Sequence, residues 1–194
     1  MTSIPGPSGL NALDGRQIGL GRSPARTALR MAVLVALLGV VFAWGQTLFR
    51  HWEAMMVAEL VRAVGQHGLL GVHDSQILLS YSSGPNLQVF WVAITPSCSS
   101  LGPALALALI SYVMSVGYPK SDRVLAGVVG VASIVVGNML RIASSVIVGL
   151  HAGRVSLVLF HDWVGSTFGF GYTVGGFVLV LAILLRRRRR REGA

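Results

Sequence analysis

The chain has 194 residues, 53% of them hydrophobic and only 12% charged, with a formal net charge of +9. Soluble proteins carry about 25% charged residues, so this composition and a mean hydropathy of +0.68 exclude an ordinary soluble domain. The cations are gathered in clusters beside apolar runs, which favours a membrane protein that attracts anionic lipid over a nucleic-acid-binding protein.

Residues 1–25 contain Gly, Pro, Ser and scattered Arg without periodicity, so we expect a disordered, basic cytoplasmic tail there. Residues 28–185 are expected to form a single membrane domain. Residues 186–194 begin with six consecutive arginines and are expected to form a second basic cytoplasmic tail.

Four apolar runs are long enough to cross a bilayer, for which a helix needs about 20 residues. They cover residues 28–49, 101–118, 124–149 and 167–185. The predicted fold class is therefore an all-α integral membrane protein with about four transmembrane helices.

The segment 50–100 between the first two runs is expected to lie outside the cytoplasm. Within it, Trp52, Met55, Met56, Leu60 and Val64 recur at helical spacing, which predicts an outer amphipathic helix on the membrane surface. The following stretch, 69–95, is punctuated by glycines and rich in β-branched and aromatic residues, which indicates a small extracytoplasmic hairpin or β-like cap.

The distribution of cations predicts the orientation in the membrane. Twelve of the sixteen Lys and Arg residues fall in alternate connections, which the positive-inside rule assigns to the cytoplasm. We therefore expect a multi-pass protein of the cell (plasma or inner) membrane, with both termini cytoplasmic. The opposite face is then made of residues 50–100 and 150–166.

Cys98 is the only cysteine, which excludes an intramolecular disulfide and a C-x-x-C redox pair. It lies between Pro96 and Pro103 in a serine-rich stretch, a context typical of a helix N-terminus. Free backbone N–H groups there lower a thiol pKa and can hold an oxyanion. The alternative is a buried cysteine that serves only as a small hydrophobe.

Arg141 is the only charged residue inside the run 124–149, and it lies ~26 Å along that helix from Val124. An arginine at this depth needs a partner or a polar cavity, and Asn138 is on the same helix face, three residues earlier. There the guanidinium could stabilise a thiolate or an oxyanion. The alternative is an arginine that reaches the outer phosphates.

His161 comes just before the last apolar run, where an imidazole can exchange protons with a thiol and a leaving amine. His151 lies in the same connection, and chemistry alone does not choose between the two. None of the five histidines has the spacing of a metal-binding pair, so no metal or other cofactor is expected, although His161 with Asp162 keeps that option open.

The order of these motifs resembles the exosortase/archaeosortase family of polytopic membrane cysteine transpeptidase-like proteins. The matching residues are an outer cysteine, N-x-x-R late in the next apolar run and H-x-x-x-G before the last. The resemblance covers about half the chain, from Pro96 onward. Ser100 stands where the family usually has glycine, and the chain would be a compact, short member.

The resemblance implies Cys98 as nucleophile with Arg141 and His161 as its catalytic partners. By the same motifs Asn138 and Gly165 are supporting residues, and Ser99 is expected to support the cysteine as its neighbour. The implied function is cleavage of C-terminal sorting signals of exported proteins through a thioester intermediate. Such a substrate carries a hydrophobic helix and a basic tail, and the acceptor is water, an amine, a lipid or a glycan.

A non-enzymatic membrane assembly or scaffold protein is the main alternative. Small residues abound in the last two apolar runs, and Gly171 with Gly175 forms a G-x-x-x-G of the kind that packs helices closely. A transporter with Arg141 as an anion site is less favoured, because the chain has no paired halves.

Overall fold

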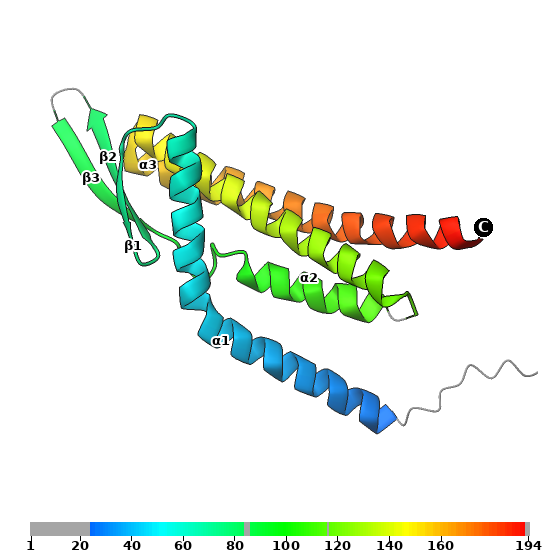
Figure 1. The fold of residues 1–194 in the computed structure, drawn as a ribbon. Coiled ribbons are helices and arrows are strands. Elements are labelled where there is room, and N and C mark those ends of the chain that lie inside the picture. Colours follow the sequence, from blue (N-terminus) through cyan, green and yellow to red (C-terminus); the bar gives the residue numbers. More distant parts are fainter. Residues whose placement is uncertain (1–23, 84–85, 116, 193–194) are drawn as a thin grey trace, which may run out of the picture. The chain divides into compact units, whose positions relative to one another are not determined.

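The computed structural model describes residues 24–83, 86–115 and 117–192. The elements follow in the order α1 (Pro24–Ala63), β1 (Leu69–His73), β2 (Gln76–Ser83), β3 (Asn86–Ala93), α2 (Leu101–Met114) and α3 (Lys120–Glu192) (Figure 1). The chain forms two compact units, Met1–Gly39 and Val40–Ala194. The second unit holds the sheet, α2, α3 and the last part of α1.

The expectation of an all-α protein with four transmembrane helices is wrong. The chain contains a three-stranded antiparallel sheet, and only two of the described helices, Ala28–Ala63 and Lys120–Arg189, are long and apolar enough to cross a membrane. Helix α2 has 14 residues, or ~21 Å, which is less than the ~30 Å of a bilayer core. The predicted spans 124–149 and 167–185 both belong to α3.

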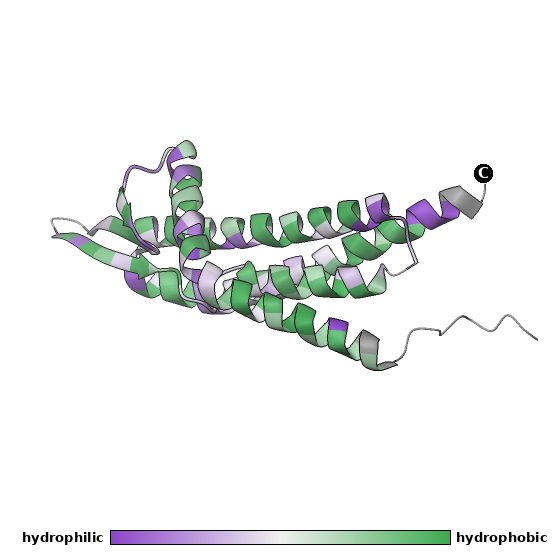
Figure 2. Cartoon of the chain, turned by 60° about the horizontal axis from the view of Figure 1, so that its bottom comes forward, coloured by the Kyte–Doolittle hydropathy of each residue, from purple (hydrophilic) through white to green (hydrophobic). Residues whose placement is uncertain are grey.

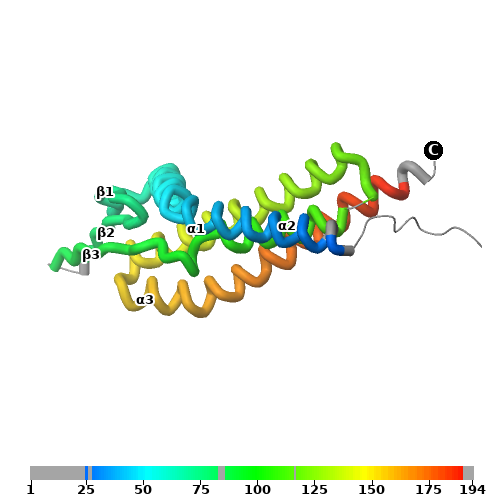
Figure 3. The backbone as a smooth tube through the Cα atoms, turned by 90° about the horizontal axis from the view of Figure 1, so that it is seen from below, coloured from blue at the N-terminus to red at the C-terminus, as the bar shows by residue number. Residues whose placement is uncertain are grey.

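Helix α3 doubles back on itself at Gly153, whose φ of 78° and ψ of −178° are not helical. Such a positive φ is readily adopted only by glycine. The two arms, residues 120–152 and 154–192, run back along each other (Figures 1 and 3). At their far ends Arg187 Nη1 donates to Asp122 Oδ1 at 2.7 Å. The second arm is helical through Glu192, where the sequence predicted a tail from residue 186.

Glycine allows the two arms of α3 to approach each other closely. A Cβ added at Gly130 would lie 2.5 Å from Val180 Cγ2, and one added at Gly137 would lie 2.7 Å from Tyr172 Cβ. Helix α2 packs on the same pair of arms, and its apolar side chains complete a buried cluster with theirs. The buried members of this cluster are Ala104, Leu107, Ala126, Ile134, Val180 and Leu184.

The sheet has the strand order β1-β2-β3, one strand more than a hairpin. Strands β1 and β2 meet at a tight turn, where Asp74 has a φ of 50° and His73 pairs with Gln76. Strand β3 pairs with β2 and is an edge of the sheet. Ile77 and Leu79 alternate along β2 with 0% exposure, as expected for a strand with one buried face.

The stretch 52–65 is not a separate amphipathic helix, because α1 continues unbroken to Ala63. Its predicted membrane-facing side is open, since Trp52, Met55 and Met56 are 42–50% exposed. The opposite, buried side carries smaller side chains, which contact the sheet and α3. These three parts share one core, made of Ala54, Val57, Ala58, Val61, Leu69, Ile77, Leu79, Ile94, Ile142, Ala143, Val146 and Leu157.

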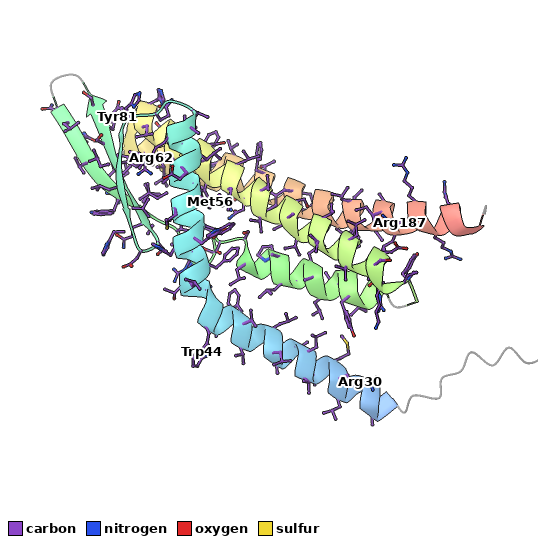
Figure 4. The ribbon with its side chains drawn as sticks, viewed as in Figure 1. Arg30, Trp44, Met56, Arg62, Tyr81 and Arg187 are labelled. Carbon is purple, nitrogen blue, oxygen red and sulfur yellow. The ribbon has the colours of Figure 1, made fainter. Side chains whose placement is uncertain are left out.

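Large apolar side chains cover much of the outside of the long helices. Hydrophobic residues run along both arms of α3 and along α1 (Figure 2). The most apolar windows of the two long helices are only 17% and 0% buried, and Trp44, 85% exposed, projects away from α1 (Figure 4). Exposed apolar faces of this extent are compatible with membrane association. The predicted tail residues 1–23, 193 and 194 lie outside the described residues.

Candidate active site

Cys98 lies in a turn that follows β3, three residues before α2 begins at Leu101. The turn is closed by the hydrogen bond from Cys98 N to Thr95 O at 3.0 Å. Ser99 is 5% exposed, and its Oγ accepts a hydrogen bond from Leu101 N at 3.3 Å, the first N–H group of α2. The N-cap residue itself, Ser100, makes no side-chain capping bond.

The backbone N–H groups around the cysteine are already used within the chain. Ser100 N donates to Glu53 Oε1 at 3.0 Å, Leu101 N to Ser99 Oγ, and Cys98 N to Thr95 O. These three groups therefore do not offer the free donors that the sequence predicted for an oxyanion. The side chain of Arg141 is a further candidate donor.

Cys98, Arg141 and His161 meet at one nitrogen. His161 Nε2 lies 3.2 Å from Cys98 Sγ and 3.1 Å from Arg141 Nη2. Arg141 is on the first arm of α3 and His161 on the second. Twenty residues of straight helix would separate them by ~30 Å, so the reversal at Gly153 brings them together.

The hydrogen bonds of His161 define its tautomer. Ser145 Oγ donates to Arg141 O at 3.0 Å and lies 3.5 Å from His161 Nδ1, so at Nδ1 the serine oxygen acts as the acceptor. A guanidinium only donates, so Arg141 also needs a lone pair on Nε2. Both contacts fit a ring whose proton is on Nδ1, with the single lone pair of Nε2 shared between Arg141 Nη2 and the Cys98 thiol.

The contact with His161 lowers the pKa of the Cys98 thiol from 9.0 to about 7, because an imidazole that has taken a proton on Nε2 donates it to the thiolate. Partial burial of the sulfur opposes this shift, and a further hydrogen bond from Thr95 Oγ1, at 3.0 Å from Sγ, supports it. Near neutral pH a substantial fraction of Cys98 is therefore thiolate, the nucleophilic form of cysteine.

Asn138 connects the nucleophile to the arginine. Its side chain is 1% exposed, and Nδ2 donates to Cys98 O at 2.9 Å and to Glu53 Oε1 at 3.0 Å. Its Oδ1 accepts from Tyr172 Oη at 3.1 Å and from Arg141 Nη1 at 3.5 Å. These four bonds use both donors and both acceptor positions of the amide.

Glu53 is a member of the site that sequence reasoning missed. It is 0% exposed, and its Oε1 accepts from Ser100 N, from Ser100 Oγ at 2.7 Å and from Asn138 Nδ2, while Oε2 has no hydrogen-bond partner among the described residues. The sequence prediction placed this acid on the polar face of the amphipathic helix. The available signal was its helical spacing with Val57 and Val61, four and eight residues later.

Gly165 provides space for Arg141. A Cβ at this position would lie 2.8 Å from Arg141 Nε, closer than real Cβ contacts come. Arg141 Nε is itself buried and has no hydrogen-bond partner among the described residues. The glycine of the H-x-x-x-G motif therefore lets the guanidinium pass between the arms of α3.

His151 lies outside this cluster. Its side chain is exposed, and its Nδ1 lies 2.9 Å from Ile147 O of the same helix arm. Asp162 is also exposed. Over the residues that the structure describes, no group of three or more His, Cys, Asp or Glu side chains is placed to hold a metal ion.

Comparisons of the chain with protein-family models, with curated proteins and with solved structures found no match.

Proposed function

We propose that this protein is a membrane-associated cysteine peptidase-transpeptidase that cleaves C-terminal sorting signals of exported proteins. The observation that carries the proposal is the 3.2 Å contact between Cys98 Sγ and His161 Nε2, with Arg141 on the same nitrogen. A thiol beside an imidazole is the usual arrangement of an activated cysteine nucleophile. The resemblance of the motif order to exosortases and archaeosortases supports the same reaction class.

In the proposed reaction His161 Nε2 takes the thiol proton and the Cys98 thiolate attacks the scissile carbonyl carbon. The new S–C bond forms while the C=O π electrons move to the oxygen. When this intermediate collapses, the C–N bond breaks, and the leaving amine takes the proton from the imidazolium. The remaining thioester passes its acyl group to water, or to an amine or hydroxyl group of a lipid or glycan acceptor.

Arg141 would change partner during this reaction. In the unliganded site its Nη2 donates to His161 Nε2, the lone pair that must receive the thiol proton. A developing oxyanion attracts the guanidinium more strongly than a neutral imidazole does. Its move to the oxyanion would free Nε2 for the proton and avoid two adjacent cations, arginine and imidazolium.

The spacing of cations along α3 supports a location of the site at the outer face of the membrane. Lys120, Arg123 and the run that includes Arg187 gather at the end of α3 where Arg187 meets Asp122. Nineteen residues of helix separate Asp122 from Arg141, or ~29 Å, about the thickness of the hydrocarbon core. If the cationic end is cytoplasmic, Cys98 faces outward and the C-terminus is cytoplasmic. The arginines that precede the first apolar run favour the same side for the N-terminus.

The scaffold alternative is less well supported than it was from the sequence alone. Gly130, Gly137 and Gly176 pack within the chain, where added Cβ atoms would lie 2.5–2.9 Å from neighbouring side chains. These glycines are therefore explained without a partner helix, whereas Gly171 and Gly175 have nothing within 4 Å and leave the G-x-x-x-G face open. A scaffold role also gives no reason for Cys98 and Arg141 to contact the same nitrogen of His161.

The experiment that tests the proposal is a comparison of the C-terminal peptides of exported membrane proteins by mass spectrometry. Host cells would produce wild type, Cys98→Ser or Arg141→Lys at equal membrane levels, with His151→Ala as the histidine control. We expect substrates to keep their C-terminal hydrophobic helix with Cys98→Ser, and cleavage to fall about 100-fold or more with Arg141→Lys. Normal cleavage by Cys98→Ser would refute the proposed function.

A further inference from the structure

A cavity of about 210 Å³ adjoins both Cys98 and His161. Its walls come from the end of β3, the segment after it and both arms of α3. Most of these walls are aliphatic, and the side chains that provide them are Val92, Ile94, Ile142, Val146, Leu157 and Val158.

The size of the cavity fits part of a substrate. At ~30 Å³ per water molecule, 210 Å³ corresponds to about seven waters, and sites for whole drug-sized ligands measure ~300–1,000 Å³. The cavity therefore suits one side chain with adjoining backbone, held next to the reacting sulfur.

The hydroxyl groups in the cavity wall already form hydrogen bonds within the protein, so they do not require a polar ligand. Ser145 Oγ donates to Arg141 O, and Thr95 Oγ1 bonds Cys98 Sγ and lies 2.9 Å from Ser97 Oγ. Asp162 is the only carboxylate in the lining, and it would repel an acidic side chain.

The cavity and the Arg141 side chain are separate neighbours of the Cys98 thiol. Arg141, Asn138 and Glu53 are not part of its lining, whereas Cys98 and His161 are. The carbonyl oxygen of a substrate can therefore face Arg141 while its side chain occupies the cavity.

From this geometry we infer that the cavity binds an aliphatic side chain of the residue whose carbonyl carbon Cys98 attacks. This inference rests on the proposed function, and it names the class of residue at the cleaved bond. An aliphatic side chain gains by leaving water, whereas a basic side chain would find only the carboxylate of Asp162, which is exposed to solvent.

The test uses N-acetylated chloromethyl ketones of leucine, glycine and aspartate on the full chain in detergent micelles. The Cys98 thiolate displaces chloride, so an S–C bond forms as the C–Cl bond breaks, and intact mass reports the single modified cysteine. We expect the leucine reagent to react at least about tenfold faster than the glycine reagent, and the aspartate reagent to react more slowly than the glycine reagent.

Val158→Phe narrows the cavity from a position that is 46% exposed, so the variant should fold. Its matched control is Val155→Phe on the same arm, 72% exposed and outside the lining. We expect the leucine reagent to lose about tenfold in rate with Val158→Phe and nothing with Val155→Phe. Iodoacetamide, which has no side chain, should react with both variants within about twofold of wild type.

The outcomes separate this inference from the proposed function. Equal rates for the leucine and glycine reagents, with iodoacetamide alkylation still titrating near pH 7, would overturn the cavity assignment and leave the cysteine enzyme standing. A Cys98 that reacts with every reagent as an ordinary thiol, titrating near its usual pKa, would overturn both.

Discussion

Replacement of His161 by alanine tests the environment of the nucleophile most directly. In the wild-type protein the hydrogen bond with His161 is the largest influence on the Cys98 thiol and lowers its pKa to about 7, against the effect of burial. Without the imidazole, only the weaker hydrogen bonds from Thr95 and Ser97 oppose that burial. We therefore expect the pKa of Cys98 in His161→Ala to rise to about 8.5 or above.

The expected change in rate reverses sign with pH. A pKa of about 7 makes Cys98 about half thiolate at pH 7, whereas a pKa of about 8.5 leaves about 3%. The more basic thiolate is, however, about fivefold more nucleophilic, because reactivity towards disulfides rises with pKa with a slope of ~0.4–0.5. The variant should therefore react about threefold more slowly than wild type at pH 7 and about fourfold faster at pH 9.

The assay follows the release of thiopyridone from 4,4′-dithiodipyridine by the only cysteine of the chain, from about pH 5.5 to pH 10, in detergent micelles. His151→Ala is the matched control, since that histidine is exposed and bonded only within its own helix arm. It should reproduce the wild-type profile. If His161→Ala keeps a midpoint near 7 and the two profiles do not cross, the contact with His161 does not control the thiol.

Three further predictions concern the surroundings of the site. Glu53→Ala removes the acceptor of three buried hydrogen bonds and should lower the free energy of unfolding by about 2–4 kcal/mol. Glu53→Gln keeps an acceptor oxygen and should lower the free energy of unfolding by clearly less. Equal losses for the two variants in denaturant titrations would contradict this. Gly165→Ala places a methyl group 2.8 Å from Arg141 Nε and should reduce substrate cleavage at least about tenfold. At Gly169 the nearest atom is 3.7 Å away, so Gly169→Ala should cleave normally when the C-terminal peptides are compared by mass spectrometry. Gly137→Ala should destabilise the protein by about 1–3 kcal/mol, because its methyl group meets a tyrosine at 2.7 Å; Gly171→Ala, with nothing within 4 Å, should melt at the wild-type temperature or above it.

Cys98 and Arg141 could be proposed from the sequence because a lone cysteine at a polar helix start and an arginine within an apolar run both require an explanation. His161 was preferred to His151 only by the H-x-x-x-G motif of the family that the chain resembles. The contact of Cys98 and Arg141 with His161 could not be derived in the same way. It depends on the reversal of α3 at Gly153, where the sequence suggested an ordinary connection over 150–166.

The number of membrane-spanning helices was overestimated because hydropathy counts residues without regard to where a helix ends. The apolar run 101–118 includes the turn after α2, which stops at Met114 with a C-cap at Ser115. Gly117 has a φ of 100°, which ends helical geometry, and Pro119 follows. The remaining helix is apolar but short.

Glu53 shows what the sequence pattern of residues 52–65 could not supply. The large side chains Trp52, Met55 and Met56 predicted a side that faces the membrane, and these residues are exposed. Which polar residue of the other side enters the protein depends on the contacts of α1 with the sheet and α3. The stripe with Ala54 and Val57 is accordingly the buried one, and it carries the acid into the site.

The three-residue spacing between Asn138 and Arg141 now has a physical reason. Positions i and i+3 share one helix face, so one amide can hold the Cys98 carbonyl with Nδ2 and the guanidinium with Oδ1. A residue inserted between them would turn the arginine by ~100° around the helix, away from His161. The motif therefore fixes the distance between the backbone of the nucleophile and the cation that we propose stabilises the oxyanion.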